Sequence, residues 1–253
     1  MKISDEVLQV LNNSKIENNL LFLPPNLDRK LYLKVNDALI SIGLIWNKKQ
    51  KCHVSETDIE DKLEEIINTG EYDSLKEKKK ELNFFETPQH TAEAMVKIAD
   101  VRGLNCEVLE PSCGKGRIVK EIMVKTPNIT IIEIDKENYN YTLNAFPCVG
   151  YKENGNVDFL SVAPEEIFDR IIMNPPFSKS REILHILHTW KFLKSGGILV
   201  SVCSLSPFFR NNQKSIDFRT FLEDNDAEII DLPEGSFKES GTNIRTKLIK
   251  IKK

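Results

Sequence analysis

The chain has 253 residues and a mass of 29.0 kDa, enough for one full α/β domain and a smaller appendage. Its formal net charge of −3 gives no overall attraction to a polyanion, so any surface for nucleic acid has to be local. The five cysteines stand singly, without zinc-ligand or disulfide spacing, so we expect no metal. With no membrane-length apolar run and no signal-peptide pattern, we expect a cytoplasmic protein without a membrane partner.

The first 83 residues are predicted to form a small α+β subdomain, in which helices surround a short hairpin. Apolar residues at helical spacing predict one helix between the capping residue Asn26 and Gly43. A second helix is predicted to start at the Thr-x-x-Glu capping box of residues 57–60. A polar, lysine-rich segment at residues 75–81 ends this extension, which is a candidate for nucleic-acid recognition.

The hairpin of this extension is predicted to have strands at residues 44–46 and 52–54, joined by a basic turn. Lys48 and Lys49 lie in that turn, next to Trp46. Lysines at an exposed tip can bind phosphates, so both are candidate substrate-binding residues. The alternative is a solvated turn beside a buried tryptophan.

From residue 84 to residue 253, strand and helix patterns alternate, which predicts a doubly wound, mostly parallel α/β sheet. Helices fill the gaps between strands, and the first of them opens at Thr87-Pro88. The expected strands lie at residues 107–110, 129–134, around 157–158, 170–173, 197–203, 228–232 and 245–251. The loop between the last two is too short for a crossover, so they must be antiparallel. This seven-stranded layout with an antiparallel C-terminal hairpin resembles the Rossmann-like fold of class I methyltransferases.

A strand–loop–helix segment at residues 108–118 carries Gly114 and Gly116 just after the strand. Glycines let a backbone turn tightly and approach a ligand at a helix N-terminus. The segment lacks the third glycine of a pyrophosphate fingerprint, which argues against a dinucleotide. It favours a smaller ligand, such as the methionine end of S-adenosylmethionine.

Two acids follow at the expected ends of the next strands. Glu133 comes about 20 residues after the glycine loop, where an acid commonly accepts ribose hydroxyls. Asp158 is predicted to end the third strand, where it could accept an adenine amino group while Phe159 covers the base. Either acid alone could be an ordinary solvated side chain at a strand end.

The most specific pattern is Asn174-Pro175-Pro176-Phe177, directly after the fourth predicted strand. The two prolines hold the backbone rigid and have no N–H to donate. The Asn174 side-chain oxygen and the Pro175 carbonyl can therefore accept both N–H bonds of a substrate amino group, leaving the nitrogen lone pair free to attack a methyl sulfonium. Phe177 offers a stacking face for an unstacked base. A rigid loop without a catalytic role is the alternative.

These stretches together resemble the adenine-N6 group of the DNA amino-methyltransferases, which carry the Asn-Pro-Pro-aromatic signature. Residues 84–88 resemble that group's first cofactor motif, and residues 232–237 resemble its loop with a second aromatic residue against the flipped base. The resemblance covers residues 84–253. It implies S-adenosylmethionine as cofactor, DNA as partner and the following roles. The cofactor-binding residues would be Phe85, Thr87, Glu110, Ser112, Gly114, Glu133, Asp158 and Phe159; the catalytic residues Asn174, Pro175, Pro176 and Phe177; and the base-stacking residues Phe177 and Phe237.

Residues 27–32, with Gly43, Trp46 and His53, resemble the N-terminal extension of phage- and mobile-element-type adenine methyltransferases. In this motif order a target-recognition domain usually follows the catalytic domain, whereas the present sequence ends with the last strand. We therefore expect recognition to come from residues 1–83, from a partner subunit of a restriction-modification system, or from a homodimer. Methylation of an RNA base or a protein glutamine stays open, as does a catalytically silent nucleic-acid-binding module.

Overall fold

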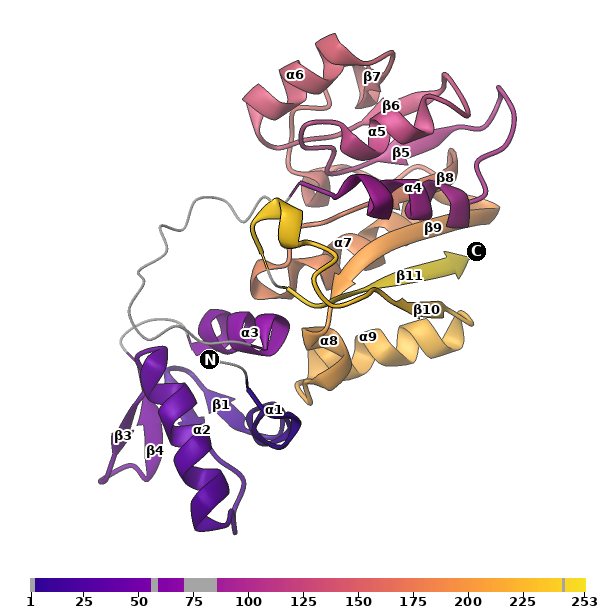
Figure 1. Cartoon of the computed structure of the whole chain (residues 1–253). Helices are drawn as coiled ribbons and strands as arrows, with labels where there is room; N and C mark the ends of the chain where they lie inside the picture. The colour runs from indigo at the N-terminus through magenta and orange to yellow at the C-terminus, as the bar shows by residue number, and fades with distance from the viewer. Residues whose placement is uncertain (1–2, 56–58, 71–85, 243) are drawn as a thin grey trace.

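The computed structural model describes residues 3–55, 59–70, 86–242 and 244–253, and shows two units, each with its own sheet (Figure 1). The small unit consists of α1 (Asp5–Asn12), β1 (Lys15–Glu17), β2 (Leu20–Phe22), α2 (Arg29–Ser41), β3 (Ile45–Asn47), β4 (Cys52–Val54) and α3 (Ile59–Thr69). Its four strands are antiparallel in the order β1-β2-β4-β3. The helices α1, α2 and α3 close a core against this sheet around Leu21, Leu39 and Leu63.

The helix α2 begins later than the sequence predicted. Its N-cap is Asp28, whose carboxylate accepts hydrogen bonds from the backbone N–H groups of Lys30 and Leu31. Asn26 has φ 63° and lies in the preceding turn. An aspartate at the helix start satisfies backbone donors that would otherwise have no partner, so the capping signal was assigned to the wrong residue. The predicted box at residues 57–60 lies largely outside the described residues.

The large unit holds the second sheet. Its helices and strands are α4 (Gln89–Ile98), β5 (Val108–Glu110), α5 (Arg117–Ile122), β6 (Ile129–Ile131), α6 (Lys136–Ala145), β7 (Val149–Gly150), β8 (Phe168–Met173), α7 (Arg181–Thr189), β9 (Leu193–Ser204), α8 (Ser206–Phe209), α9 (Gln213–Asp224), β10 (Glu228–Asp231) and β11 (Thr246–Lys252). Five short 3-10 helices join them: η1 (Tyr151–Glu153), η2 (Phe159–Ser161), η3 (Ser178–Ser180), η4 (Trp190–Phe192) and η5 (Lys238–Ser240).

The seven strands lie in the order β10-β11-β9-β8-β5-β6-β7. The pairs among β9, β8, β5, β6 and β7 are parallel, whereas β11 runs antiparallel to both β9 and β10. This confirms the predicted α/β sheet with an antiparallel C-terminal hairpin. Parallel strands need both faces covered, and alternate residues of β8 enter separate cores. Ile172 packs with α4 and α5, whereas Ile171 and Met173 pack with α7 and α9.

The third strand of the predicted sheet was misplaced. The structure has β7 at Val149–Gly150, and no strand at residues 157–158. Asp158 instead caps η2 by accepting a hydrogen bond from the Leu160 N–H at 3.0 Å. Aspartate competes with a strand ladder by bonding backbone groups close to it in sequence, whereas a strand of two residues leaves almost no periodic pattern to detect.

The helix α3 joins the two units. Its apolar face, with Ile59, Leu63 and Ile66, belongs to the core of the small unit. Its polar residues Glu64 and Asn68 are buried against the large unit, where they accept hydrogen bonds from backbone N–H groups of Ser180 and Ser206. The boundary between residues 83 and 84 stays a prediction, because residues 71–85 lie outside the described part of the chain. Within that part, no helix has the length and apolarity required to cross a membrane.

Candidate functional site

The glycine loop between β5 and α5 forms the floor of the site. Gly114 and Gly116 have φ of 50° and 75°, in the left-handed region that favours glycine. A Cβ atom on Gly116 would lie 2.5 Å from the ring of Phe146. The Thr142 hydroxyl donates a hydrogen bond of 2.8 Å to the Gly114 carbonyl. Conformation and space therefore both require glycine at position 116.

Glu133, which follows β6, lies directly beside this loop. Its carboxylate accepts hydrogen bonds from the backbone N–H groups of Gly114, at 2.8 Å, and Asp135, at 2.9 Å. Burial raises the pKa of Glu133, while the hydrogen bonds from Asp135 and Gly114 oppose that shift. The structure thus brings the predicted ribose-binding acid and the glycine loop together.

Glu110 ends β5 and is buried under the same loop, with 1 % of its surface exposed. Burial and the charge of Glu133 raise its pKa well above the usual range of a carboxyl group. Within the described part of the chain, its Oε2 atom has no hydrogen-bond partner. A buried acceptor without a partner costs free energy, and it suits a cationic donor brought by a ligand.

Asn174 follows β8 at the same edge of the sheet, where its side-chain Nδ2 donates a hydrogen bond of 3.1 Å to the Thr87 hydroxyl. Thr87 is buried and precedes α4, 87 positions away along the chain. Pro175 and Phe177 are buried and Pro176 is half-buried. The hydrogen bond from Asn174 to Thr87 therefore fixes the orientation of the asparagine amide.

These elements line a small cavity that is partly open to solvent. The lining residues are Glu86, Thr87, Glu110, Ser112, Cys113, Lys115, Arg117, Ile118 and Asn174. Four of the predicted site residues, Thr87, Glu110, Ser112 and Asn174, thus lie around one cavity.

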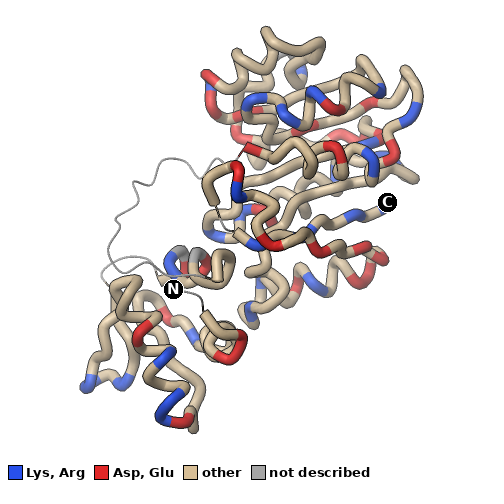
Figure 2. Tube along the Cα trace, viewed as in Figure 1, with Lys and Arg blue, Asp and Glu red and all other residues tan. Residues whose placement is uncertain are grey.

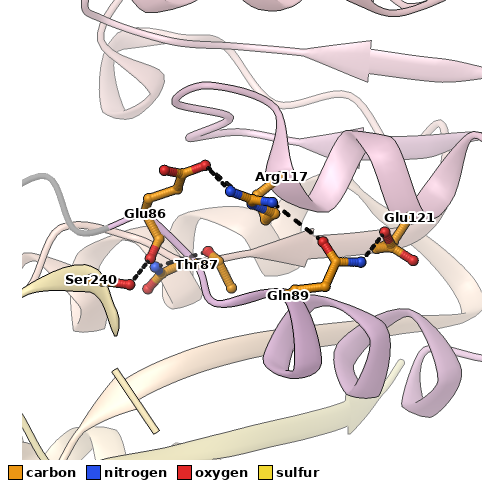
Figure 3. Close-up of polar contacts among 7 residues, drawn as sticks. Glu86, Thr87, Gln89, Arg117, Glu121 and Ser240 are labelled. Atoms are coloured by element: carbon orange, nitrogen blue, oxygen red, sulfur yellow. Dashed lines mark hydrogen bonds and ion pairs between the residues drawn. The ribbon is translucent and has the colours of Figure 1, made fainter. Parts of the chain in front are cut away.

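The cavity also holds charged residues that the sequence analysis missed. Arg117 forms an ion pair of 2.7 Å with Glu86 and contacts the side chain of Gln89 (Figure 3). The Ser240 hydroxyl, from the loop before β11, donates a hydrogen bond to the Glu86 carbonyl. Basic residues at positions 115 and 117, next to the glycines, were the available signal. Acidic and basic side chains in one cavity suit a zwitterion, such as the amino-acid end of S-adenosylmethionine.

The predicted adenine-binding pair is not among the residues that line this cavity. The Asp158 carboxylate forms an ion pair of 3.1 Å with Arg181, the first residue of α7. Phe159 is buried and packs against His185 with ring centroids 5.7 Å apart. Asp158 is thus held at the start of the helix that follows the Asn-Pro-Pro-Phe loop.

The predicted base-stacking residues are buried in this structure. Phe237 has 0 % of its surface exposed and Phe177 5 %, and both belong to the core cluster that includes Met95 and Val202. Lys48 and Lys49 are exposed at the tip of the β3–β4 hairpin, in the small unit (Figure 2). Phe85 lies outside the described residues. No group of three or more metal-ligating side chains is found among the residues described.

Comparisons with known proteins place the fold. Residues 90–210 match the family model described as Methyltransferase small domain. The methyltransferase subunit of a type I restriction-modification system from Streptococcus thermophilus is similar, with a TM-score of 0.56 and 22% sequence identity. The match covers 67% of this chain and 45% of the chain of that subunit. The M protein of the type I restriction enzyme EcoKI has a TM-score of 0.58 at 13% identity, over 99% of this chain and 58% of its own.

A putative class I S-adenosylmethionine-dependent methyltransferase from Listeria monocytogenes has a TM-score of 0.52 at 16% identity, over 66% of this chain and 60% of its own. The chain therefore spans 45–60% of the length of these three structures. No curated protein sequence matches it. The family match and the sheet topology give the large unit the Rossmann-like methyltransferase fold, and the family match supports S-adenosylmethionine as the cofactor.

Proposed function

We propose that the protein transfers a methyl group from S-adenosylmethionine to the N6 amino group of adenine in DNA, with the target base flipped out of its strand. The observation that carries the proposal is the contact between Asn174 and Thr87 at the wall of the cofactor cavity. It holds a rigid loop of hydrogen-bond acceptors beside the place where the cofactor would bind. Such a loop suits a planar amino group with two N–H bonds.

The cofactor site is assigned to the cavity between the glycine loop and Thr87. Glu133, beside Gly114, would accept the ribose hydroxyls, since its carboxylate already accepts backbone donors there. Glu110 and Glu86 would hold the α-ammonium group, while Arg117 would bind the α-carboxylate. When bound, the cofactor supplies a methyl group activated by a sulfonium. Asp158 stays the candidate for the adenine amino group of the cofactor, which requires it to exchange its contact with Arg181.

Asn174 and Pro175 would act on the substrate. The Asn174 side-chain oxygen and the Pro175 carbonyl accept the two N–H bonds of the adenine amino group, which turns the nitrogen lone pair towards the methyl group. Because this lone pair is the nucleophile, positioning and electrostatics carry most of the rate. Phe177 and Phe237 are proposed to stack on the flipped base, which requires both rings to move from their buried positions.

DNA is preferred as the substrate because two similar structures, with TM-scores of 0.56 and 0.58, are described as the methyltransferase subunit of a type I restriction-modification system and the M protein of a type I restriction enzyme. We further propose a phage- or mobile-element-type enzyme. Target recognition would come from the small unit, with Lys48 and Lys49 on phosphates, from a partner recognition subunit or from a second copy of the chain. Methylation of an RNA base or of a glutamine amide would use the same loop and is an outcome of the test.

The test incubates the protein with cofactor carrying a labelled methyl group and with four substrates in parallel. These are an adenine-containing DNA duplex, the same duplex with purine in place of adenine, a matching RNA and a glutamine-containing peptide. The proposal expects label only in the first, and none with the Asn174→Ala variant. Equal label in the purine duplex, or label in RNA or peptide alone, would contradict it. A catalytically silent nucleic-acid-binding module would show no binding of S-adenosylmethionine in calorimetry.

A further inference from the structure

A carboxylate from the small unit reaches the loop that follows Asn174–Phe177. The Glu64 side chain on α3 accepts two hydrogen bonds from the backbone N–H of Ser180, at 3.0 and 3.1 Å, and one from its hydroxyl at 3.2 Å. Glu64 is 4 % exposed and Ser180 is 7 % exposed. The two residues are 116 positions apart in the sequence. This is a water-excluded, charged contact from one unit to the backbone of the other.

The loop that Glu64 holds has an unusual backbone. Lys179 and Ser180 have φ of 56° and 51°, so two successive residues other than glycine lie in the left-handed region. This conformation is strained for residues other than glycine and persists only where the surroundings require it. The Ser180 N–H also donates to the Phe177 carbonyl at 3.1 Å. The same turn is therefore tied at one end to the catalytic motif and at the other to Glu64.

A second buried carboxyl group lies close to Glu64. Glu182, two residues after Ser180, is fully buried, and burial together with the Glu64 carboxylate raises its pKa well above the usual range. Glu182 in turn accepts a hydrogen bond from the Ser204 hydroxyl at the end of β9. A neutral side chain would pack at position 64 without this repulsion. An ionised acceptor makes the stronger hydrogen bonds to a backbone N–H.

We propose that Glu64 is a positioning residue for methyl transfer, and that it is the residue through which α3 acts on the Asn174–Phe177 loop. Its carboxylate fixes the turn at residues 177–180, and this turn, at the end of the rigid Asn-Pro-Pro-Phe loop, holds Asn174 at the cofactor cavity. The inference rests on the proposed function for its effect on the reaction, but the contact itself can be tested separately. It gives the small unit a role in catalysis that does not depend on binding DNA.

The test compares Glu64→Ala and Glu64→Gln with Asn68→Ala. Asn68 is a matched control, because it lies one helical turn further along α3, is buried, and accepts a hydrogen bond of 3.0 Å from the Ser206 N–H, away from the catalytic loop. For each variant, kcat and KM for DNA, the Kd of the cofactor and the hydrogen exchange of the Ser180 amide are measured. The exchange measurement does not require activity.

Glu64→Ala is expected to lower kcat at least tenfold, since misplacement by about 1 Å can cost on the order of 100-fold. Its cofactor Kd should stay within about twofold of wild type, because Glu64 does not line the cavity, and its Ser180 amide should exchange faster. Glu64→Gln keeps the side-chain shape and one acceptor, so its kcat should lie between those of the wild type and Glu64→Ala. Asn68→Ala should keep kcat within about twofold, even where its Tm falls.

The inference is wrong if Ser180 exchange is unchanged in Glu64→Ala, or if that exchange rises while kcat does not fall. It is equally wrong if Asn68→Ala lowers kcat as much as Glu64→Ala, because the effect would then come from a loosened interface. If Glu64→Ala does not fold, Glu64→Gln decides: a wild-type kcat and wild-type KM with faster exchange would overturn the inference. If the wild-type protein transfers no methyl group, the proposed function is wrong. The hydrogen exchange of the Ser180 amide still decides whether Glu64 holds the loop.

Discussion

The glycine loop and the Asn-Pro-Pro-Phe loop lie at the same edge of the sheet, but different parts of the chain hold them. The glycine loop is held by residues that follow it closely: Glu133 and Thr142 bond to Gly114 across 19 and 28 positions. The loop after β8 is held by Thr87 and Glu64, across 87 and 116 positions. The proposed cofactor side is thus held within the segment from β5 to α6, whereas the proposed substrate side depends on contacts from Thr87 and from the small unit.

Asn174→Ala tests the separation between the two sides most strongly. Loss of one preorganised polar group that acts on the reacting centre costs about 10²–10³-fold in kcat, and we expect a decrease of that size. The cofactor Kd should stay within about threefold, because the glycine loop keeps its own contacts. Methyl-transfer kinetics and calorimetry measure the two quantities. If Asn174→Ala loses much of its cofactor affinity while kcat is unchanged, Asn174 belongs to the cofactor side and the assignment is wrong.

Glu110→Gln should act on the cofactor side alone. A charge-assisted hydrogen bond contributes about 1.5–3 kcal/mol, so cofactor affinity should fall by about tenfold or more. The Tm should not fall, since the raised pKa of Glu110 means that folding favours its protonated form. The free energy of unfolding of the wild-type protein should therefore fall as pH rises through that pKa. The difference in Tm between Glu110→Gln and the wild type should grow with pH, because Gln does not ionise.

Calorimetry and thermal melts at several pH values check this pair of opposite effects. Glu137→Gln, at an exposed position on α6, is the control and should change neither quantity. A Glu110→Gln protein that binds the cofactor normally would show that the buried carboxylate has only a structural role.

Thr87→Val removes the hydroxyl that orients Asn174 while keeping the side-chain shape. Since a hydrogen bond contributes about 0.5–1.5 kcal/mol net, kcat should fall about two- to tenfold, less than in Asn174→Ala. Adding Thr87→Val to Asn174→Ala should lower kcat little further, because both changes remove the same contact. Fully additive losses in kcat would show that Thr87 acts independently of Asn174.

The smallest effect is expected for Lys48→Ala with Lys49→Ala, on the exposed hairpin of the small unit. DNA affinity should fall only several-fold, because exposed ion pairs contribute about 0.2–1 kcal/mol each, and kcat at saturating DNA should not change. Each lost phosphate contact should lower the slope of binding against salt by about 1. Lys97→Ala, an exposed change on α4, serves as control. An unchanged salt slope would remove this hairpin from the DNA interface.

The residues that the sequence could predict are those whose signal is local. The glycine loop and Asn174–Phe177 each follow a strand without interruption, so strand, turn and function are readable together. Asp158 was placed on a strand, because its capping of η2 depends on a three-residue turn, and its role at the site stays a prediction. Asp28 was passed over in favour of Asn26, since either residue type can cap a helix.

The sequence contains no local pattern that predicts contacts between distant residues. Glu64 lies on a helix with ordinary amphipathic spacing, and nothing in that spacing indicates that its carboxylate meets Ser180 in the other unit. Arg117 was similarly overlooked as the residue after a glycine, although its ion pair with Glu86 lies at the cavity. Such contacts arise only when distant parts of the chain pack together, which explains why the sequence predicted the glycine loop and Glu133 but not the contacts of Arg117 and Glu64.

The position of the methyl group in the product tests the central claim most directly. DNA treated with the protein and a cofactor carrying a ¹³C-methyl group is digested to nucleosides and analysed by mass spectrometry, with Asn174→Ala in parallel. The account predicts that the label appears in N6-methyldeoxyadenosine with the wild-type protein and falls at least about 100-fold with the variant. Label in another nucleoside, or equal label with Asn174→Ala, would contradict it.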